Sequence, residues 1–329
     1  MAEPFWSWRL LVTVTTTVPT ATAAGSVRLA DRRGTLASMP ELPEVEALVA
    51  FLRERAVGRV VARIDVPGIH VLKTYSPPVT ALAGLTIDGA ARHGKFLDLT
   101  CVTKAAGDLH VIVHLARSGW IRWRDSAPGA ASRLRKGPMA ARLILDDGSG
   151  LDITEAGTKK SLAIYIVAVP SLVSGIARLG PDPLQPEFTE AVFADILRLA
   201  GRSQIKGVLR SQSNIAGIGN AYSDEILHAA KMSPFKPATM TADETSRLYA
   251  ALQSTLRGAI ARADGLSASE LKKEKKSGMQ VHGRTGLACP VCGDTIRQVI
   301  FTDSSFQYCP TCQTGGKPLA DRVLSRLLK

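Results

Sequence analysis

Residues 204–230 read QIKGVLRSQSNIAGIGNAYSDEILHAA, two apolar helical runs separated by a tight GIG turn. The second run is predicted to begin near Asn220, with Ser223, Asp224 and Glu225 in its first turn. Glycines let the backbone approach a ligand closely, and unpaired N–H groups at a helix N-terminus suit a phosphate. By itself the pattern also fits an ordinary helical hairpin that binds nothing.

The whole chain has 329 residues, is 45% hydrophobic and carries a formal net charge of +12. Such a chain can bury a sizeable core and divides into two or three units. Residues 1–38 account for a net charge of only +2, so the basicity belongs to the folded part. It indicates a polyanionic partner, although ribosomal and membrane-surface proteins share this balance. We find no apolar stretch near the roughly 18 residues of a spanning helix, and we expect a soluble protein.

The pattern of apolar residues changes twice along the chain. Residues 43–56 predict a helix with proline and acids early and arginines late. Residues 59–170 predict an antiparallel sandwich or barrel, because short segments alternate apolar and polar residues: 59–66, 81–90, 93–102, 108–115, 119–125 and 141–154. The Pro-rich stretch 180–188 is a plausible hinge, and a helical pattern follows it to about residue 266. KKEKKSG, at 272–278, is predicted to be a charged linker.

Four of the five cysteines form two Cys-x-x-Cys pairs, Cys289/Cys292 and Cys309/Cys312, with 16 residues between them. This spacing predicts one structural Zn2+, because four thiolates leave no open coordination position for a water. The metal would hold together a module too small to fold on core burial alone. Cys101, in an alternating apolar run, is expected to be a buried core thiol. A reducing intracellular setting fits all five, which predicts a cytoplasmic or nucleoid location.

The stretch SMPELPEVE, at 38–46, places a proline directly behind an internal methionine. If translation begins at Met39 and that residue is removed, Pro40 has a free secondary amine, which is a nucleophile. An α-amine titrates at about 8, against about 10.4 for lysine, so much of it is neutral at cellular pH. If residues 1–38 stay attached, the same nitrogen is an inert amide. We expect this extension to be a mis-called start or to be cleaved, although its acid-poor composition also resembles a targeting signal.

Four motifs together resemble the formamidopyrimidine-DNA glycosylase and endonuclease VIII family: MPELPEVE, HGKF, QSNIAGIGNAYSDEIL and VHGR…CPVC…CPTCQ. They stand in the family's order and cover Met39 to about Lys317. The resemblance implies an α+β fold with an N-terminal helix and β-sandwich, then a helix-two-turn-helix domain and a zinc-finger hairpin. The expected boundaries are 1–38 for the extension, 39–175 for the catalytic domain, 186–268 for the helical domain and 279–317 for the zinc finger.

The resemblance also implies a bifunctional base-excision repair enzyme that flips a damaged nucleotide out of duplex DNA. Its catalytic residues would be Pro40, Glu41, Glu44 and Lys95. The Pro40 nitrogen would attack the sugar and form a Schiff base, and β- and δ-elimination would then cut the strand. Glu41 would be the general acid/base, Glu44 would position the site, and Lys95 would bind a phosphate. Outside this pattern, both acids read as ordinary helix N-terminal charge and Lys95 as a solvated side chain.

The implied partner is double-stranded DNA with a damaged base or an abasic site, bound by a monomer. Lys206 and Asn220 would grip its phosphates, a contact that does not depend on sequence. Arg117, in HLARSG, stands where the family has a methionine that fills the gap left by the flipped base, and it could wedge into the duplex. The stretch TEAGTKKSL has no match for an arginine and a phenylalanine of the family, and Lys159 or Lys160 there could meet phosphates.

A further departure lies in the zinc hairpin, where Ser304 stands near the position of the family's phosphate-binding arginine. Either Gln307 or a lysine elsewhere substitutes, or DNA binding is weaker. Two other classes of protein remain open: a catalytically silent damaged-DNA-binding protein of the same fold, and a zinc-finger regulator that reads sequence. The regulator predicts a base-reading helix in the cysteine module, and we find none. Oxidised purines, oxidised pyrimidines and abasic sites all remain open as the lesion.

Overall fold

The computed structural model describes residues 39–102, 107–126, 138–157, 160–301 and 304–319. The extension 1–38 and Lys159 therefore lie outside the described residues. The strands are β1 Val61–Asp65, β2 Thr86–His93, β3 Phe96–Val102, β4 Leu109–His114, β5 Gly119–Arg124, β6 Met139–Leu145, β7 Gly150–Glu155, β8 Ala163–Val167, β9 Arg297–Ile300 and β10 Ser305–Tyr308. The α-helices are α1 Leu42–Arg55, α2 Ser174–Ala177, α3 Glu190–Ala200, α4 Ile205–Arg210, α5 Asn220–Ala229, α6 Ala242–Ala263, α7 Leu271–Gly278 and α8 Pro310–Thr314. Short 3-10 turns are η1 Ile69–Val71, η2 Val79–Leu82 and η3 Pro170–Leu172.

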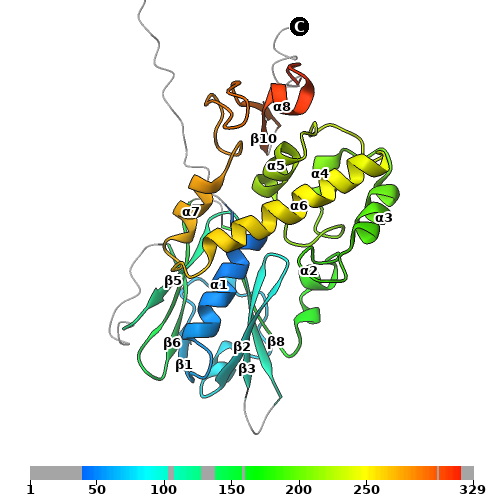
Figure 1. The fold of residues 1–329 in the computed structure, drawn as a ribbon. Helices are drawn as coiled ribbons and strands as arrows, with labels where there is room; N and C mark the ends of the chain where they lie inside the picture. Colours follow the sequence, from blue (N-terminus) through cyan, green and yellow to red (C-terminus); the bar gives the residue numbers. More distant parts are fainter. Residues whose placement is uncertain (1–38, 103–106, 127–137, 158–159, 302–303, 320–329) are drawn as a thin grey trace, which may run out of the picture. The chain divides into compact units, whose positions relative to one another are not determined.

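The predicted sandwich is confirmed as two four-stranded antiparallel sheets, with strand orders β1-β6-β7-β5 and β2-β3-β4-β8 (Figure 1). Alternation along β3 shows why: Leu97, Leu99 and Cys101 are each at most 2% exposed and face the core between the sheets. Cys101 is thus the buried thiol that was expected. β8 was not among the segments predicted as strands, because its short apolar run AIYIV has little alternation.

Helix α1 joins the sandwich to the helical part of the chain. Its apolar stripe, which includes Val45, Leu48 and Leu52, packs into the sandwich core. Leu42, at its start, belongs instead to the core formed by α3, α4, α5 and α6. Figure 1 shows α6 crossing beside α1 and α5, and it contacts both. The N-terminal end of α1 is therefore held where the two cores meet.

The predicted hinge, residues 180–188, is tied to α1 by a buried guanidinium. Arg92, at the end of β2, pairs with Glu46 at 2.7 Å and reaches both carboxylate oxygens of Asp182 at 2.7 and 3.1 Å. Its side chain is only 4% exposed. Charge-assisted bidentate contacts of this kind fix orientation as well as distance. Hinge motion at this segment stays a prediction.

The prediction of a linker at 272–278 is wrong, because these residues form most of α7. Leu271 and Lys275, four positions apart, share one helix face and are 1% and 4% exposed. Leu271 packs into the sandwich core, whereas Lys272, Lys273 and Lys276 are exposed. The run of lysines hides this amphipathic face, since one of its two buried residues is itself a lysine.

The C-terminal module is the hairpin β9–β10, which the resemblance implied, followed by α8, which was not predicted. Phe306 and Tyr308 of β10 are buried beside Phe235, which gives the hairpin a small aromatic core. None of the helices formed by the described residues is long and apolar enough to cross a membrane.

Candidate active site

The carboxylate of Glu41 occupies the N-terminus of α5. It accepts hydrogen bonds from the backbone N–H groups of Gly219 at 2.6 Å, Ala221 at 2.9 Å and Tyr222 at 3.3 Å. The prediction that these N–H groups are free to bind a phosphate is therefore wrong. The helix end does bind an anion, as its dipole favours, but the anion is a side chain of the same protein.

The GIG turn explains how α1 can come so close. Gly217 has φ +89°, and a Cβ there would come within 2.7 Å of the Leu42 side chain. A Cβ on Gly219 would come within 2.4 Å of the carboxyl carbon of Glu41. Both glycines are therefore required for the packing of α1 against α5. Gly217 is needed for its positive φ and because a side chain would clash, and Gly219 only because a side chain would clash.

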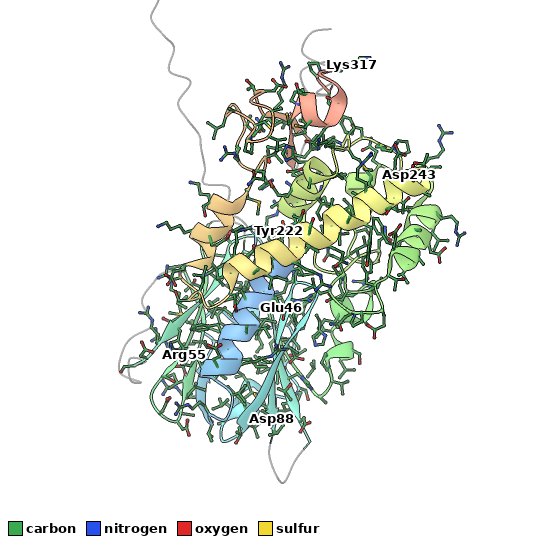
Figure 2. All side chains as sticks on the ribbon, in the orientation of Figure 1. Glu46, Arg55, Asp88, Tyr222, Asp243 and Lys317 are labelled. Carbon is green, nitrogen blue, oxygen red and sulfur yellow. The ribbon has the colours of Figure 1, made fainter. Side chains whose placement is uncertain are left out.

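Glu44 is the centre of a second set of contacts, one helical turn from Glu41. Its Oε2 accepts the backbone N–H of Glu41 at 2.8 Å and the Lys275 Nζ at 2.7 Å, and its Oε1 accepts the Tyr222 hydroxyl at 2.6 Å. Figure 2 shows Tyr222 close to α1, the helix that carries Glu46. Glu44 is 3% exposed, so a buried charge is matched by one cation and two further donors.

Lys275 brings a third element, α7, into the site. Besides Glu44, its Nζ donates to the backbone oxygen of Met39 at 3.0 Å and lies 5.0 Å from the centre of the Tyr222 ring. Sequence reasoning missed this residue. The only local signal is its four-residue spacing from Leu271, which a run of lysines obscures.

Pro40 lies at the start of this cluster and is buried. In the chain as printed its nitrogen is the amide of the Met39–Pro40 bond. Glu41 and Glu44 follow it on α1, and the carbonyl group before it faces Lys275. The structure therefore brings three of the four predicted catalytic residues together with one cation that was not predicted.

Lys95, the fourth, lies in the turn between β2 and β3 and is 8% exposed. Burial lowers its pKa, an effect that the charge of Glu41 offsets only in part. Burial and the charge of Lys95 together lower the pKa of His114 to about 4, so this histidine is neutral near pH 7. No hydrogen bond joins the Lys95 ammonium to any other described residue.

The charges around Glu41 decide its protonation state. Burial would raise the pKa of Glu41, but Lys275, Lys95 and the N–H group of Ala221 more than offset this and lower it below its ordinary value. Burial, and next the charge of Glu44, raise the pKa of Tyr222 well above its ordinary value. The site therefore holds an ionised Glu41 beside a neutral phenol.

The two predicted phosphate-binding residues of the helical part are already engaged. Lys206 is 6% exposed, and its Nζ donates to Asp224 Oδ1 at 2.6 Å and Ser223 Oγ at 2.7 Å. Asn220 Nδ2 donates to the Ser305 oxygen at 2.7 Å, while its Oδ1 is buried and has no hydrogen-bond partner among the described residues. Phosphate binding by Lys206 would need its ion pair to open, so both contacts stay predictions.

The four cysteines converge as the spacing predicted. Their sulfur atoms all lie within 4.8 Å of one another, with Cys289 and Cys312 3.9 Å apart and Cys292 and Cys309 3.3 Å apart. Four thiolates at about 2.3 Å from one metal ion would be about 3.8 Å apart, so the donor set fits a tetrahedral ion. His228 Nε2 lies 3.3 Å from the Cys289 sulfur and suits a supporting hydrogen bond.

Comparison with known proteins agrees with this geometry. The model for the formamidopyrimidine-DNA glycosylase N-terminal domain matches residues 39–156, and that for its H2TH domain matches residues 179–270. The formamidopyrimidine-DNA glycosylase of Symbiobacterium thermophilum is 34% identical over 286 residues, which are 84% of this chain and 89% of that protein. The chain belongs to the formamidopyrimidine-DNA glycosylase family.

Two further relatives of this family are informative. An uncharacterised formamidopyrimidine-DNA glycosylase-like protein of Mycobacterium tuberculosis is 57% identical over 155 residues, which are 46% of this chain and 94% of that protein. The Lactococcus lactis Fpg, solved in complex with DNA containing an abasic site, has a TM-score of 0.71 and 26% identity. That match covers 83% of this chain and 99% of that chain.

Against the family pattern, Arg117 is exposed in the turn between β4 and β5 and has no hydrogen bond or ion pair with another described residue. The residue before it, Ala116, has φ 52°, which favours glycine and indicates a tight turn. Lys160 donates to the backbone oxygen of Glu155 at 2.6 Å. The exposure of Arg117 is compatible with the wedge role, and the roles of Arg117 and Lys159 both stay predictions.

Gln307, one of the residues expected to substitute for the arginine of the zinc hairpin, is buried, so this role stays a prediction. Its side chain is 1% exposed, with Oε1 facing the Gly283 N–H at 3.4 Å and Nε2 facing the Ser305 hydroxyl at 3.3 Å. Ser304 is half-buried and directly precedes β10. The other two alternatives, a lysine elsewhere in the chain and weaker DNA binding, also remain predictions.

Proposed function

We propose that this chain is a base-excision repair DNA glycosylase with AP-lyase activity, which acts on double-stranded DNA that contains a damaged base or an abasic site. The observation that carries the proposal is the buried cluster of Pro40, Glu41 and Glu44 at the junction of α1 and α5, with Lys95 and Lys275 beside it. Membership of the family supports the same activity, and one relative was solved with abasic-site DNA.

The nucleophile of the proposed reaction is the nitrogen of Pro40, once Met39 and the residues before it are absent. Its lone pair forms a bond to the sugar C1′ as the bond from C1′ to the base breaks and its electron pair leaves with the base. The ring oxygen then takes a proton and leaves C1′, and the nitrogen loses its own proton and forms a C=N iminium bond. β- and δ-elimination break the C–O bonds to the two flanking phosphates.

Glu41 is suited to move protons in these steps. Because it is ionised in the free protein, it first acts as an acceptor and stabilises positive charge on the sugar and the iminium nitrogen. A proton taken up by Glu41 can then be returned to a leaving oxygen. Glu44, held by Tyr222 and Lys275, positions the start of α1 and does not need to react.

The DNA backbone would be held by Lys95, whose ammonium is free of other described hydrogen-bonding groups, and by Lys206 and Asn220. Arg117 would enter the duplex beside the flipped nucleotide. Phosphate contacts release counterions, so affinity should fall steeply as salt increases. The logarithm of the binding constant should fall with the logarithm of the salt concentration by a slope of about 0.9 per contact. The proposed enzyme acts as a monomer in the cytoplasm or nucleoid.

The metal bound by the four cysteines is proposed to be one structural Zn2+. Sulfur ligands in a tetrahedral arrangement favour zinc, and a filled coordination shell gives it no part in the reaction. Its role would be to keep the hairpin β9–β10 folded against α5, where the Ser305 oxygen contacts Asn220.

A second candidate is a catalytically silent damaged-DNA-binding protein of the same fold. The amide form of Pro40 in the printed chain favours it for any molecule that keeps the extension. The two candidates separate in one experiment, in which chains that start at Met1 and at Pro40 are each incubated with an abasic-site duplex and borohydride. If the chain is the proposed enzyme, the form starting at Pro40 should cleave the strand and form a covalent adduct. If that form gives no adduct, the silent DNA-binding protein is favoured.

A further inference from the structure

Lys275 is the one cation of the site that comes from α7, and it faces the peptide bond in front of Pro40. Its Nζ is 3.0 Å from the Met39 oxygen and 2.7 Å from Glu44 Oε2. The oxygen and nitrogen of one peptide group lie about 2.2 Å apart, so this ammonium is within about 5 Å of the Pro40 nitrogen. When Met39 is absent, the ammonium loses an acceptor and faces the amine.

Two acids and two lysines lie near the amine. Glu41 is surrounded by N–H groups of α5, and the charge of Lys275 and then that of Lys95 on the β2–β3 turn lower its pKa. Among the described residues, Lys275 alone forms an ion pair with Glu44, although the charge of Glu44 also acts on Lys95, and the Tyr222 phenol beside Glu44 is neutral. Other titratable groups in the surroundings are Glu274 on α7, Arg210 on α4 and His282 after α7.

A charge within about 4–6 Å of an amine shifts its protonation equilibrium: an anion favours the ammonium form and a cation favours the neutral form. Without Lys275, Glu44 would lose the cation paired directly with it, and its carboxylate would favour the protonated form of the Pro40 amine. A protonated amine has no lone pair and cannot attack C1′.

We propose that Lys275 is a positioning residue that offsets the charge of Glu44, so that the Pro40 amine stays neutral and nucleophilic near neutral pH. This inference rests on the proposed function, because it assigns the nucleophile to Pro40. It gives α7 a role in the reaction through its buried lysine.

The test uses the full folded chain beginning at Pro40, as wild type and as Lys275→Met, Lys275→Arg, Glu44→Gln and the double variant Lys275→Met/Glu44→Gln. Lys276→Met is the matched control, since Lys276 is the next residue of α7 and is exposed. The first readout is the rate of borohydride trapping on an abasic-site duplex as a function of pH. The second is the titration of 13C-labelled proline at position 40 by NMR, which needs no DNA.

For Lys275→Met we expect the inflection of the pH profile, which marks deprotonation of the Pro40 amine, to move up by about one pH unit. Trapping at neutral pH should then be about tenfold slower and should recover at high pH. Glu44→Gln should move it down, and the double variant should return it close to wild type. Lys275→Arg and Lys276→Met should follow the wild type. Lys275→Met alone leaves Glu44 buried and unpaired, which could prevent folding. The double variant removes that charge as well and so keeps the test usable.

Two results would overturn the inference: a Lys275→Met profile lowered equally at every pH, which indicates a structural role alone, or an unchanged inflection in both readouts. A wild-type chain that gives no adduct would instead contradict the proposed function. The NMR titration would still measure the effect of Lys275 on the amine in that case, so the two failures remain distinguishable.

Discussion

Glu41 and Gly219 are 178 positions apart, and the carboxylate of Glu41 accepts the Gly219 N–H at 2.6 Å. The contact joins the start of α1, which belongs to the sandwich, to the start of α5 in the helical part. The N-terminus of α5 therefore has two roles. It packs against the start of α1, and its N–H groups stabilise a carboxylate beside the proposed nucleophile. Stability and activity are therefore expected to respond together to changes here.

Gly219→Ala should destabilise the protein, because the added methyl group would meet the Glu41 carboxylate at 2.4 Å. Overpacking of a tight contact typically lowers the free energy of unfolding by about 1–3 kcal/mol. Gly258→Ala is the matched control: it lies inside α6, where of the described side chains the new methyl group meets only Arg262, at 3.6 Å. The control should gain about 0.5–1 kcal/mol in urea unfolding. Equal effects of the two substitutions would show that the close approach at Gly219 is not needed.

Glu41→Gln should slow base removal far more than it weakens DNA binding. The amide keeps the shape but cannot take a proton, and loss of a general acid/base typically costs about 100-fold to 10,000-fold in rate. Single-turnover kinetics with a damaged duplex and a fluorescence binding titration measure the two effects. A binding loss as large as the rate loss would place Glu41 in DNA recognition.

The ionisation of Glu41 predicts that the stability of the protein depends on pH. Burial alone would raise the pKa of Glu41, but Lys275, Lys95 and the helix N–H groups lower it below its ordinary value of 4.5. A depressed pKa means that the ionised group stabilises the fold above about pH 4.5, and that this contribution is lost as the pH falls through the folded pKa. The difference in unfolding free energy between wild type and Glu41→Gln should thus be constant from neutral pH to about pH 5 and shrink below that. A difference that grows on acidification would mean that Glu41 is protonated in the folded protein.

Cys309→Ser should remove the metal and loosen the β9–β10 hairpin. We expect metal content to fall from one equivalent per chain to none and duplex affinity to fall by roughly tenfold, about 1.4 kcal/mol. Cys101→Ala, which alters a cysteine buried in the sandwich, should keep the metal and the affinity. Elemental analysis and a binding titration give both quantities. Full affinity in a metal-free Cys309→Ser protein would remove the hairpin from DNA binding.

The fold was predictable where one period of apolar residues dominates. Alternation of apolar residues predicted most strands of the sandwich, and the cysteine spacing predicted the metal-binding module. β8 was not predicted because its short apolar run has no clear period. α7 escaped because its buried face consists of Leu271 and Lys275, and the burial of a lysine depends on a carboxylate 231 positions away.

The site was predictable only as far as its motifs reach. Pro40, Glu41 and Glu44 came from one local pattern, and the structure brings them together. The same pattern could not reveal that Glu41 fills the N-terminus of α5, because that contact forms only when the two cores meet. Lys206 was predicted to bind a DNA phosphate, and its burial and its pairing with Asp224 at 2.6 Å could not be predicted from the motif.

The central claim is that the nitrogen of Pro40 forms the covalent bond to DNA, and mapping the trapped adduct tests it most directly. The chain beginning at Pro40 would be reduced with borohydride on an abasic-site duplex, digested with trypsin and analysed by mass spectrometry. The account predicts that the sugar remnant lies on the peptide from Pro40 to Arg53, at its N-terminal nitrogen. A remnant on Lys95 or Lys275 would contradict the account and make that lysine the nucleophile.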